Sequence, residues 1–352
     1  MGFASFLARR LVTFVPTVLG VLLLTYLIAY AVPADPVRAW AGEKVRNPEA
    51  LQQIREKYKF DAPWYEQFSF LLKQLLTMNL EDPVRSKNVF DELGYRFPVT
   101  VQLALVAFAF LVLISLPLGV IAALRKDTAV DFFVRFLALF GSSMPSFVLY
   151  YFMILLLFVR YHTTYMAGIP TYSTRCALWL DSLPSSYPIL GHVLSYIGAV
   201  PMFGAAMCGE WDVVGYTLRR FYLPGLALAL LGGGFVARIV RNSFLDALGS
   251  EHVLFAKARG LKKWRIWRHV FKNAMIPVVT VLGLQLGGLL SGAVIAEYVF
   301  NIPGLGRYMY ESVLNLNYPA IIASTFVFAL VYVVINLAVD ILYALIDPRI
   351  RY

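Results

Sequence analysis

Residues Val99–Leu124 read VTVQLALVAFAFLVLISLPLGVIAAL, a run of 26 residues without a charged side chain. About 20 apolar residues in a helix cross the ~30 Å hydrocarbon layer of a membrane, so this run is long enough to span a bilayer. Polar and apolar residues do not alternate along it as they must in the strands of a membrane barrel. The run therefore predicts a membrane protein built from helices.

Five more runs of this kind occur in the chain, and the overall composition agrees with them. The chain has 352 residues, of which 59% are hydrophobic and 15% charged, with a mean hydropathy of +0.68. Soluble domains carry about a quarter charged residues, and disordered chains are less hydrophobic, so both classes are disfavoured. We expect an all-α membrane protein with six transmembrane helices in Leu11–Val32, Val99–Leu124, Phe132–Val159, Leu223–Val240, Met275–Phe300 and Ile321–Ile346.

The first of these runs has a second interpretation, since it follows two arginines. A cleaved secretory signal begins in the same way, but its apolar region is only about 7–15 residues long. Leu11–Val32 is longer than that, so a retained first transmembrane helix is expected.

Lysine and arginine are distributed unevenly between the runs. Arg238–Lys272 holds nine Lys and Arg against two acidic residues, whereas residues 33–98 hold ten of each sign. Cytoplasmic segments carry the excess of positive charge, so the basic loop and both termini are expected in the cytoplasm of a multi-pass cell (plasma or inner) membrane protein. The basic charge is thus a topology signal, and no nucleic-acid-binding motif accompanies it. The expected segments are 1–32 (cytoplasmic N-terminus, first span), 33–98 (extracytoplasmic), 99–160 (second and third spans), 161–222 (extracytoplasmic insertion) and 223–352 (last three spans, with a cytoplasmic loop at about 241–275 and a cytoplasmic C-terminus).

The two long outside segments are expected to be folded. Residues 47–80 show helical spacing of apolar residues interrupted at Pro63, which predicts two short amphipathic helices. These suit either a scaffold at the membrane surface or contact with an extracytoplasmic partner. Residues 161–222 are too long for a plain loop, so a folded or re-entrant insertion is expected there. Its apolar part, Leu190–Met207, is interrupted by a glycine and a proline.

Both cysteines of the chain, Cys176 and Cys208, fall in the second outside segment. A disulfide persists in oxidising surroundings, so a bond between them is one expectation and two buried thiols are the other.

Sequence signals of catalysis are missing. The chain contains no GxxxxGK[ST], HExxH or GxSxG motif, and its four histidines form no group with metal-ligand spacing. We therefore expect no catalytic residue, no metal site and no cofactor bound by this chain. Arg238, Glu297 and Asp340 lie toward span ends, where ionisable residues pair locally. Their positions disfavour a stand-alone secondary carrier or channel without excluding it, and an intramembrane enzyme lacks a nucleophile–base pair.

The basic loop is the most informative segment. Residues 241–279 read RNSFLDALGSEHVLFAKARGLKKWRIWRHVFKNAMIPVV. Composition favours a short helix over Glu251–Ala258, a turn with positive φ at Gly260, and a second helix from Lys262 toward Pro277. On spacing alone, a basic hairpin lying on anionic lipid explains the loop equally well.

At these residues the chain resembles the transmembrane permease subunits of dipeptide/oligopeptide-type ABC importers. That family has a helix ending in Ala-x-Ala-x-Gly-Leu, a basic stretch and then Asn-Ala-x-Ile-Pro, which begin here at Ala256 and Asn273. The resemblance covers most of the chain and includes ALQQIREKYKFDAPWYEQF, FPVTVQLAL, LPGLALAL, ARIVRNS, IPGLGR and DILYALIDPRIRY. It implies a type I ABC importer permease fold. The two long extracytoplasmic segments are expected as insertions in this fold, and the one at residues 161–222 is longer than the family leads us to expect.

The resemblance also implies partners. A second homologous permease subunit, two ABC ATPase subunits that use ATP-Mg, and an extracytoplasmic substrate-binding protein would complete the importer. The short helix of the loop would be the coupling helix, which docks into an ATPase groove. The general importer pattern has Glu and Ala where this chain has Leu254 and Phe255, so Glu251 is a candidate substitute for that Glu. The candidate coupling residues are Glu251, Phe255, Ala256, Lys257, Ala258, Gly260, Leu261, Trp264 and Arg265.

Polar and kink-forming residues within the apolar runs are candidates for the translocation path. Such residues also serve helix packing, as the Gly232–Gly234 and Gly287–Gly288 runs suggest. Peptides are the expected substrates; oligosaccharides or other solutes such as nickel chelates are the alternatives within the same family. The path candidates are Gln102, Ser142, Ser143, Met144, Pro145, Gln285 and Asn336.

Overall fold

The computed structural model describes residues 3–31, 37, 47–57, 59–82, 87–161, 172–186 and 190–346. These residues form helices and one short antiparallel hairpin. The elements are α1 (Phe3–Ala31), α3 (Pro48–Lys57), α4 (Trp64–Leu76), β1 (Glu81–Asp82), β2 (Lys87–Asn88), α5 (Val89–Leu124), α6 (Ala129–Ser143), α7 (Ser146–Tyr161), α8 (Thr174–Ser186), α9 (Leu190–Gly198), α10 (Pro201–Met207), α11 (Trp211–Gly249), α12 (Glu251–Ala258), α13 (Lys263–Val299), α14 (Leu305–Leu314) and α15 (Tyr318–Ile346).

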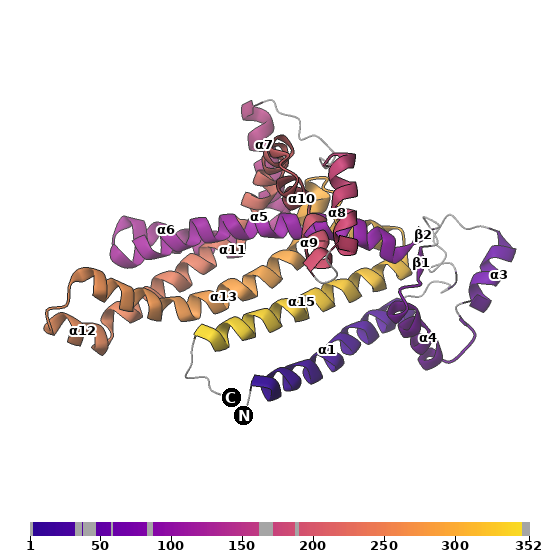
Figure 1. The fold of residues 1–352 in the computed structure, drawn as a ribbon, viewed down its shortest axis with the longest axis horizontal. Coiled ribbons are helices and arrows are strands. Elements are labelled where there is room, and N and C mark those ends of the chain that lie inside the picture. Colours follow the sequence, from indigo (N-terminus) through magenta and orange to yellow (C-terminus); the bar gives the residue numbers. More distant parts are fainter. Residues whose placement is uncertain are drawn as a thin grey trace.

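Five long helices, α1, α5, α11, α13 and α15, lie alongside one another and are long and apolar enough to cross a membrane (Figure 1). They contain five of the six predicted spans. At 1.5 Å per residue, α5, α11 and α13, with 36, 39 and 37 residues, are about 55 Å long and exceed the hydrocarbon layer. Their ends therefore project from the membrane. The projecting ends carry α12 at one end of the bundle and α3, α4 and the hairpin at the other.

The third predicted span, Phe132–Val159, is not one helix. It is divided into α6 and α7, whose axes differ by 111°. Met144 is extended, with φ −85° and ψ 128°, and Pro145 follows it. A proline lacks the backbone N–H that a helix needs and disfavours helical geometry in the residue before it. The prediction of one continuous span here was therefore wrong, and the two helices form an elbow at Met144 and Pro145.

The helix that contains the fourth predicted span, α11, is longer than predicted, because it begins at Trp211 rather than at Leu223. The last part of the 161–222 segment is thus a helical extension of this span. The predicted interruption of Leu190–Met207 is confirmed, since α9 and α10 are separate helices bent by 120°.

The first outside segment holds the two predicted amphipathic helices, α3 and α4. Pro63 is the N-cap residue of α4, which confirms the predicted break. Leu71 and Leu75 of α4 are buried, and the Tyr26 hydroxyl of α1 donates a 3.0 Å hydrogen bond to the side chain of Gln67. Helix α4 is therefore fastened to the first span, as a scaffold would be.

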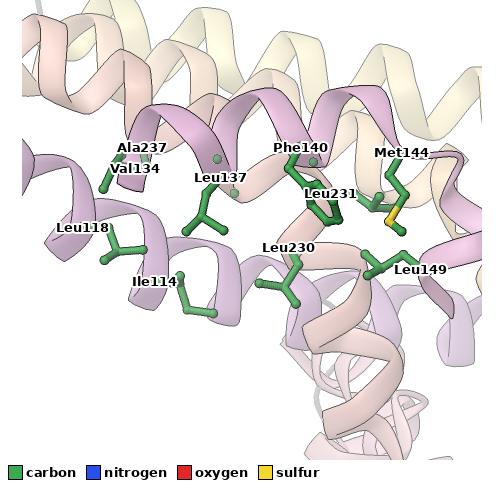
Figure 2. A pocket seen from close by; sticks show the side chains of 13 residues that line it. Ile114, Leu118, Val134, Leu137, Phe140, Met144, Leu149, Leu230, Leu231 and Ala237 are labelled. Carbon is green, nitrogen blue, oxygen red and sulfur yellow. The ribbon is translucent and has the colours of Figure 1, made fainter. Parts of the chain in front are cut away.

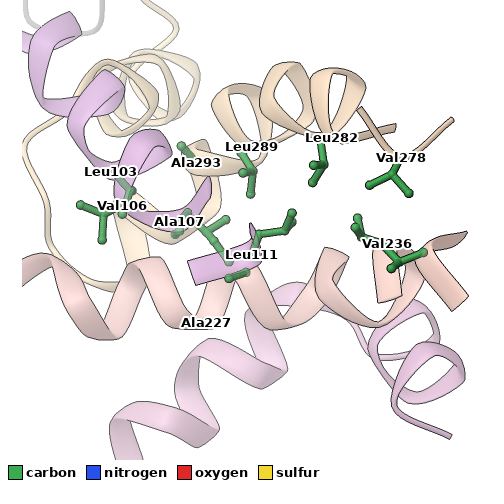
Figure 3. Close-up of a cluster of buried hydrophobic side chains, with 14 of the residues drawn as sticks. Leu103, Val106, Ala107, Leu111, Ala227, Val236, Val278, Leu282, Leu289 and Ala293 are labelled. Atoms are coloured by element: carbon green, nitrogen blue, oxygen red, sulfur yellow. The ribbon is translucent and has the colours of Figure 1, made fainter. Parts of the chain in front are cut away.

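The hydrophobic core lies between α5, α11 and α13 (Figure 3). Glycines let these helices and α6 approach closely. A Cβ atom added to Gly119 of α5 would lie 2.6 Å from the carbonyl oxygen of Ala237, and one added to Gly234 would lie 2.5 Å from the Cα of Ala138. Small residues at such crossings are a general feature of membrane helix packing. The Gly232–Gly234 run is a close-packing site, as predicted.

Buried polar contacts hold α14 at the end of the bundle opposite α12. The Asp82 carboxylate of β1 accepts 2.8 Å hydrogen bonds from the Tyr308 hydroxyl and the Asn317 amide. The buried Glu297 carboxylate accepts a 2.9 Å bond from the backbone N–H of Arg307, in the first turn of α14. Helix α14 is thus held by a carboxylate from β1, more than 200 residues earlier in the chain, and by one from the end of α13, so Glu297 has the structural role expected of it.

Local pairing also holds for the other ionisable residues near the span ends. Arg10 of α1 lies 3.1 Å from the carboxylate of Asp340 in α15, and Arg238 stacks over the ring of Phe235. The start of α1 and the end of α15 therefore lie side by side, toward the same end of the bundle as α12 (Figure 1). The predicted C-terminal tail after Ile346 lies outside the described residues.

Candidate functional site

The loop between α11 and α13 is built around a tight turn. Gly260 has φ +69°, so its predicted positive φ is confirmed. The N–H of Gly260 donates to the carbonyl of Lys257, and the N–H of Leu261 donates to the carbonyl of Ala256. These two bonds make a Schellman motif, in which a residue with left-handed backbone geometry ends a helix and satisfies its last carbonyls. The motif ends α12 and reverses the chain into α13.

The inward side of α12 is small and apolar. Val253 and Ala256 are buried against the bundle. Ala256, one of the candidate coupling residues, therefore contacts the chain's own helices and is not part of the exposed surface of α12. Leu261 is half-buried beneath the turn. These contacts set the distance between α12 and the spans.

The outward side of α12 and the start of α13 expose large apolar side chains. Leu254 is 56% exposed, Phe255 63% and Trp264 76%. Exposed apolar patches that are rimmed by polar residues mark interaction sites. Leu254 was not among the predicted coupling residues, because it departs from the importer pattern. Its position next to Phe255 on the same short helix was the available signal.

Charged residues surround this apolar surface. Glu251 lies in the first turn of α12 and Lys257 in the last, the arrangement that suits the helix dipole. The guanidinium of Arg259 stacks 4.9 Å from the centre of the Phe255 ring. Lys262 and Arg265 are exposed beyond the turn, and Ala258 is exposed just before it. The surface is thus a cationic rim around aromatic side chains, suited to binding a protein with an acidic edge.

A polar contact fastens α12 to α13. The side-chain nitrogen of Asn273 lies 2.8 Å from Nε2 of His252, and the Ser250 hydroxyl lies 3.2 Å from the same atom. Asn273 is the asparagine of the sequence pattern that carries the family resemblance. Its contact explains why an amide is found there: it holds the short helix at a fixed angle to the long one.

The predicted translocation-path residues do not form one cluster. Gln102 is fully buried and accepts a 2.9 Å hydrogen bond from the backbone N–H of Met202, so it fastens α10 to α5. Gln285 is half-buried in α13 near Gly232 of α11, and Asn336 is half-buried in α15. The others lie at the elbow: Ser143 and Pro145 are exposed, Met144 is half-buried, and the side chain of Ser142 lies outside the described part of the structure.

The two cysteines are joined. Cys176 of α8 and Cys208 form a disulfide, with their Cα atoms 5.8 Å apart. Next to it, the carboxylate of Glu210 accepts hydrogen bonds from the hydroxyl and the backbone N–H of Ser173. These bonds hold the pKa of Glu210 below its ordinary value. The insertion is therefore closed at its base by a covalent bond and by a carboxylate.

Removing the disulfide is expected to destabilise the insertion. Replacing Cys176 and Cys208 with serine opens a loop with a sequence separation of 32 residues, which in the chain-entropy account costs about 2–4 kcal/mol. Limited proteolysis of the purified protein should cleave 172–210 faster. Cys176→Ser alone should have the same effect as the double variant, because either change removes the bond. Two reactive thiols in the unreduced protein would contradict the pairing.

One buried charge cluster was missed by the sequence reasoning. Asp131, at the start of α6, is fully buried and forms an ion pair with Arg241 of α11. Arg241 stands in the segment ARIVRNS, one of the segments that carry the family resemblance. The sequence signal for this cluster was an Asp and an Arg, each near the end of a predicted span. That these two residues pair with each other is seen only in the folded structure. Among the residues that the structure describes, no three His, Cys, Asp or Glu side chains lie close enough together to hold a metal ion.

Both the N-terminal and the C-terminal part of the chain match known protein families. Residues 115–352 match the family described as binding-protein-dependent transport system inner membrane component, and residues 3–104 match the N-terminal part of such membrane components. The chain is 31% identical to the dipeptide transport system permease protein DppB of Alkalihalophilus pseudofirmus over 99% of both chains.

Two further relatives show the same coverage. The chain is 35% identical to the probable D,D-dipeptide transport system permease protein DdpB of Escherichia coli, over 99% of this chain and 98% of the relative. It is 31% identical to the glutathione transport system permease protein GsiC of Shigella flexneri over 99% of both chains. The chain therefore belongs to the inner-membrane components of binding-protein-dependent transport systems, multi-pass permeases with the type I ABC importer fold that work with separate ATPase and substrate-binding subunits.

Proposed function

We propose that this chain forms one half of the translocation path of a peptide importer and that α12 is its coupling helix. The exposed surface of Leu254, Phe255 and Trp264, fixed by the turn at Gly260, is the observation that carries the proposal. This surface lies at one end of the helix bundle, whereas the apolar surface along the sides of the spans suits contact with lipid. An ATPase subunit that receives these side chains in a groove would bury them.

The proposed mechanism is alternating access. ATP-Mg binding in the partner subunits closes the ATPase pair and displaces α12 of each permease. Because α12 is fastened through Val253, Ala256 and the His252–Asn273 contact, its displacement passes to α11 and α13. Rigid-body movement of packed helices then changes which side of the membrane the path opens to. A second homologous permease, two ATPases and one extracytoplasmic binding protein complete this assembly.

The proposed orientation places α12 and both chain ends in the cytoplasm. The excess of positive charge in Arg238–Lys272 supports it, as does the position of α12 at the same end as the start of α1 and the end of α15. The disulfide-closed insertion is then outside the cytoplasm, where such bonds persist. The path would run along α13 and α15 past Gln285 and Asn336.

Peptides are the proposed substrate class. The support is that the curated relatives named above are transport proteins for dipeptides, D,D-dipeptides and glutathione, at 31–35% identity over nearly the whole chain. An oligosaccharide substrate has no matching support among these relatives.

The test begins with a mild-detergent pull-down of the tagged chain from its native cells. Two nucleotide-binding subunits, a second permease and a secreted binding protein should copurify. The assembly is then reconstituted in liposomes with that binding protein, and uptake of radiolabelled dipeptides and oligosaccharides is measured with and without ATP. ATP-dependent dipeptide uptake is expected. Uptake by the chain alone in an ion gradient would refute the importer assignment, and ATP-driven uptake of oligosaccharide alone would refute the substrate class.

A further inference from the structure

A buried ion pair connects α6 to the helix that carries the coupling helix. Asp131 is fully buried, and the guanidinium of Arg241 donates to both oxygens of its carboxylate, with Nη2 2.7 Å from Oδ2. Two parallel hydrogen bonds from one guanidinium give geometric specificity as well as strength. The pair therefore fixes both the distance and the angle between the two helices.

Further donors complete the coordination of the Asp131 carboxylate. Arg135, one turn later in α6, donates at 2.6 Å, and the backbone N–H of Asp127 donates at 3.0 Å. The third nitrogen of the Arg241 guanidinium, Nη1, donates to the side-chain oxygen of Asn242 at 3.1 Å. A buried charge of this kind is stable only while its partners remain in place. The ion pair thus resists separation during movement of the helices.

The pair is one end of a longer contact between α6 and α11. Toward the middle of the membrane, a Cβ atom on Gly234 would lie 2.5 Å from the Cα of Ala138. Farther along, a Cβ atom on Gly141 would lie 3.1 Å from the carbonyl oxygen of Leu230. The two backbones therefore touch along almost the whole length of α6, with the ion pair at the end nearer α12.

The other end of α6 is the elbow, and a cavity lies beside it. The cavity has a volume of about 130 Å³ and an apolar lining (Figure 2). Phe140 and Met144 line it before the bend and Leu149 lines it after the bend. Apolar side chains can change position in such a space without breaking a hydrogen bond. The elbow therefore combines an interrupted helix with room for repacking.

We propose that Asp131 and Arg241 are positioning residues for coupling: their ion pair makes α6 move with α11 and α12 as one body, and bending takes place at Met144 and Pro145. Arg241 lies eight residues before the end of α11 at Gly249, and α12 begins at Glu251. A displacement of α12 thus reaches Arg241 along a short length of unbroken helix. This inference rests on the proposed function, since it needs α12 to be displaced by an ATPase.

The first test uses paired neutral variants of the reconstituted importer. Asp131→Asn leaves the buried Arg241 without a carboxylate, and Arg241→Gln leaves the buried Asp131 with only the partly exposed Arg135, so lower yields of folded protein are expected. The double variant removes both charges and should restore membrane yield and ATPase binding. Its uptake of radiolabelled dialanine per ATP hydrolysed should fall at least tenfold, because two amides do not replace the paired bonds. A double variant with the wild-type ratio would overturn the inference.

A matched control is another Arg–Asp pair between two spans. Arg10 and Asp340 join α1 to α15 and are partly exposed. The double variant Arg10→Gln/Asp340→Asn should keep the wild-type ratio of uptake to ATP hydrolysis. An equal fall in this control would show that any loss of an inter-span charge pair lowers the ratio, and would overturn the specific role of Asp131 and Arg241.

The second test measures the movement itself. Spin labels on cysteines at Phe132 and Asp246 report the distance between α6 and α11, and labels at Phe152 and Asp246 report the distance between α7 and α11. The native cysteines are bonded to each other, so they do not take up label. Adding ATP to the complete importer should change only the second distance. A change in the first distance as large as that in the second would overturn the inference. Failure of the wild-type importer to hydrolyse ATP and take up dialanine would instead refute the proposed function.

Discussion

Replacing Gly260 with proline is expected to abolish ATP-dependent uptake while leaving the chain inserted in the membrane. Gly260 has φ +69°, and proline is restricted to a φ near −65°. Proline also lacks the N–H that Gly260 donates to the carbonyl of Lys257. The turn between α12 and α13 therefore cannot form in the variant. The hydrophobic spans do not depend on this turn, so insertion should continue.

The measurement compares uptake and ATP hydrolysis in liposomes containing the assembled importer. Gly260→Asn is the matched control, because asparagine tolerates left-handed geometry and keeps the backbone N–H. It should retain most of the uptake. Gly260→Ala should be intermediate, since a Cβ atom in this conformation costs about 1 kcal/mol. No neighbouring atom lies within 4 Å of a Cβ at this position, so the effect comes from backbone geometry and not from a clash. Wild-type uptake in Gly260→Pro would contradict the assignment of α12 as the coupling helix.

Removing the exposed aromatic side chains near α12 is expected to weaken ATPase binding. In Phe255→Ala/Trp264→Ala the surface loses its two largest apolar groups, which are 63% and 76% exposed. Buried aromatic side chains at interface centres contribute about 2 kcal/mol or more each, which is roughly thirtyfold in Kd. The double variant should therefore lose the ATPase subunits in the pull-down. Titration of the permease with purified ATPase gives the change in Kd.

Trp211 offers the control for this experiment. It is 70% exposed, nearly as much as Trp264, but it begins α11 at the opposite end of that helix from α12. Trp211→Ala should leave ATPase binding unchanged. If Trp211→Ala lowered ATPase binding as much as Phe255→Ala/Trp264→Ala does, the loss would reflect general damage to the bundle. If neither did, the apolar surface at α12 would not be the docking site.

A coupling helix must bind an ATPase subunit and must also transmit the movement of that subunit to the spans. The aromatic variants test whether α12 binds an ATPase, whereas the Gly260 series tests whether α12 transmits a displacement after binding. A Gly260→Pro importer that keeps its ATPase subunits but does not take up peptide would show that binding and transmission are distinct.

The amino-acid sequence by itself determined that this is a membrane protein, that it is built from helices, and that its basic loop turns at Gly260. Spanning helices are readable because a bilayer requires long, uncharged segments, and this requirement is local in the sequence. The turn at Gly260 is readable for a similar reason: a positive φ needs a residue without a Cβ atom at one position. The excess of Lys and Arg in the basic loop predicts the orientation of the spans in the membrane.

Tertiary structure alone decided the features that depend on residues far apart in the chain. The pairing of Asp131 with Arg241 and the contact of Gln102 with Met202 join positions about 100 residues apart, and no local pattern specifies either contact. The inward direction of Ala256 likewise depends on how α12 packs against the spans. The elbow at Met144 and Pro145 was predictable only in part. Its proline was visible in the sequence and disfavours helical geometry at Met144. The 111° angle between α6 and α7 depends on how both helices pack against α11, which no local pattern specifies.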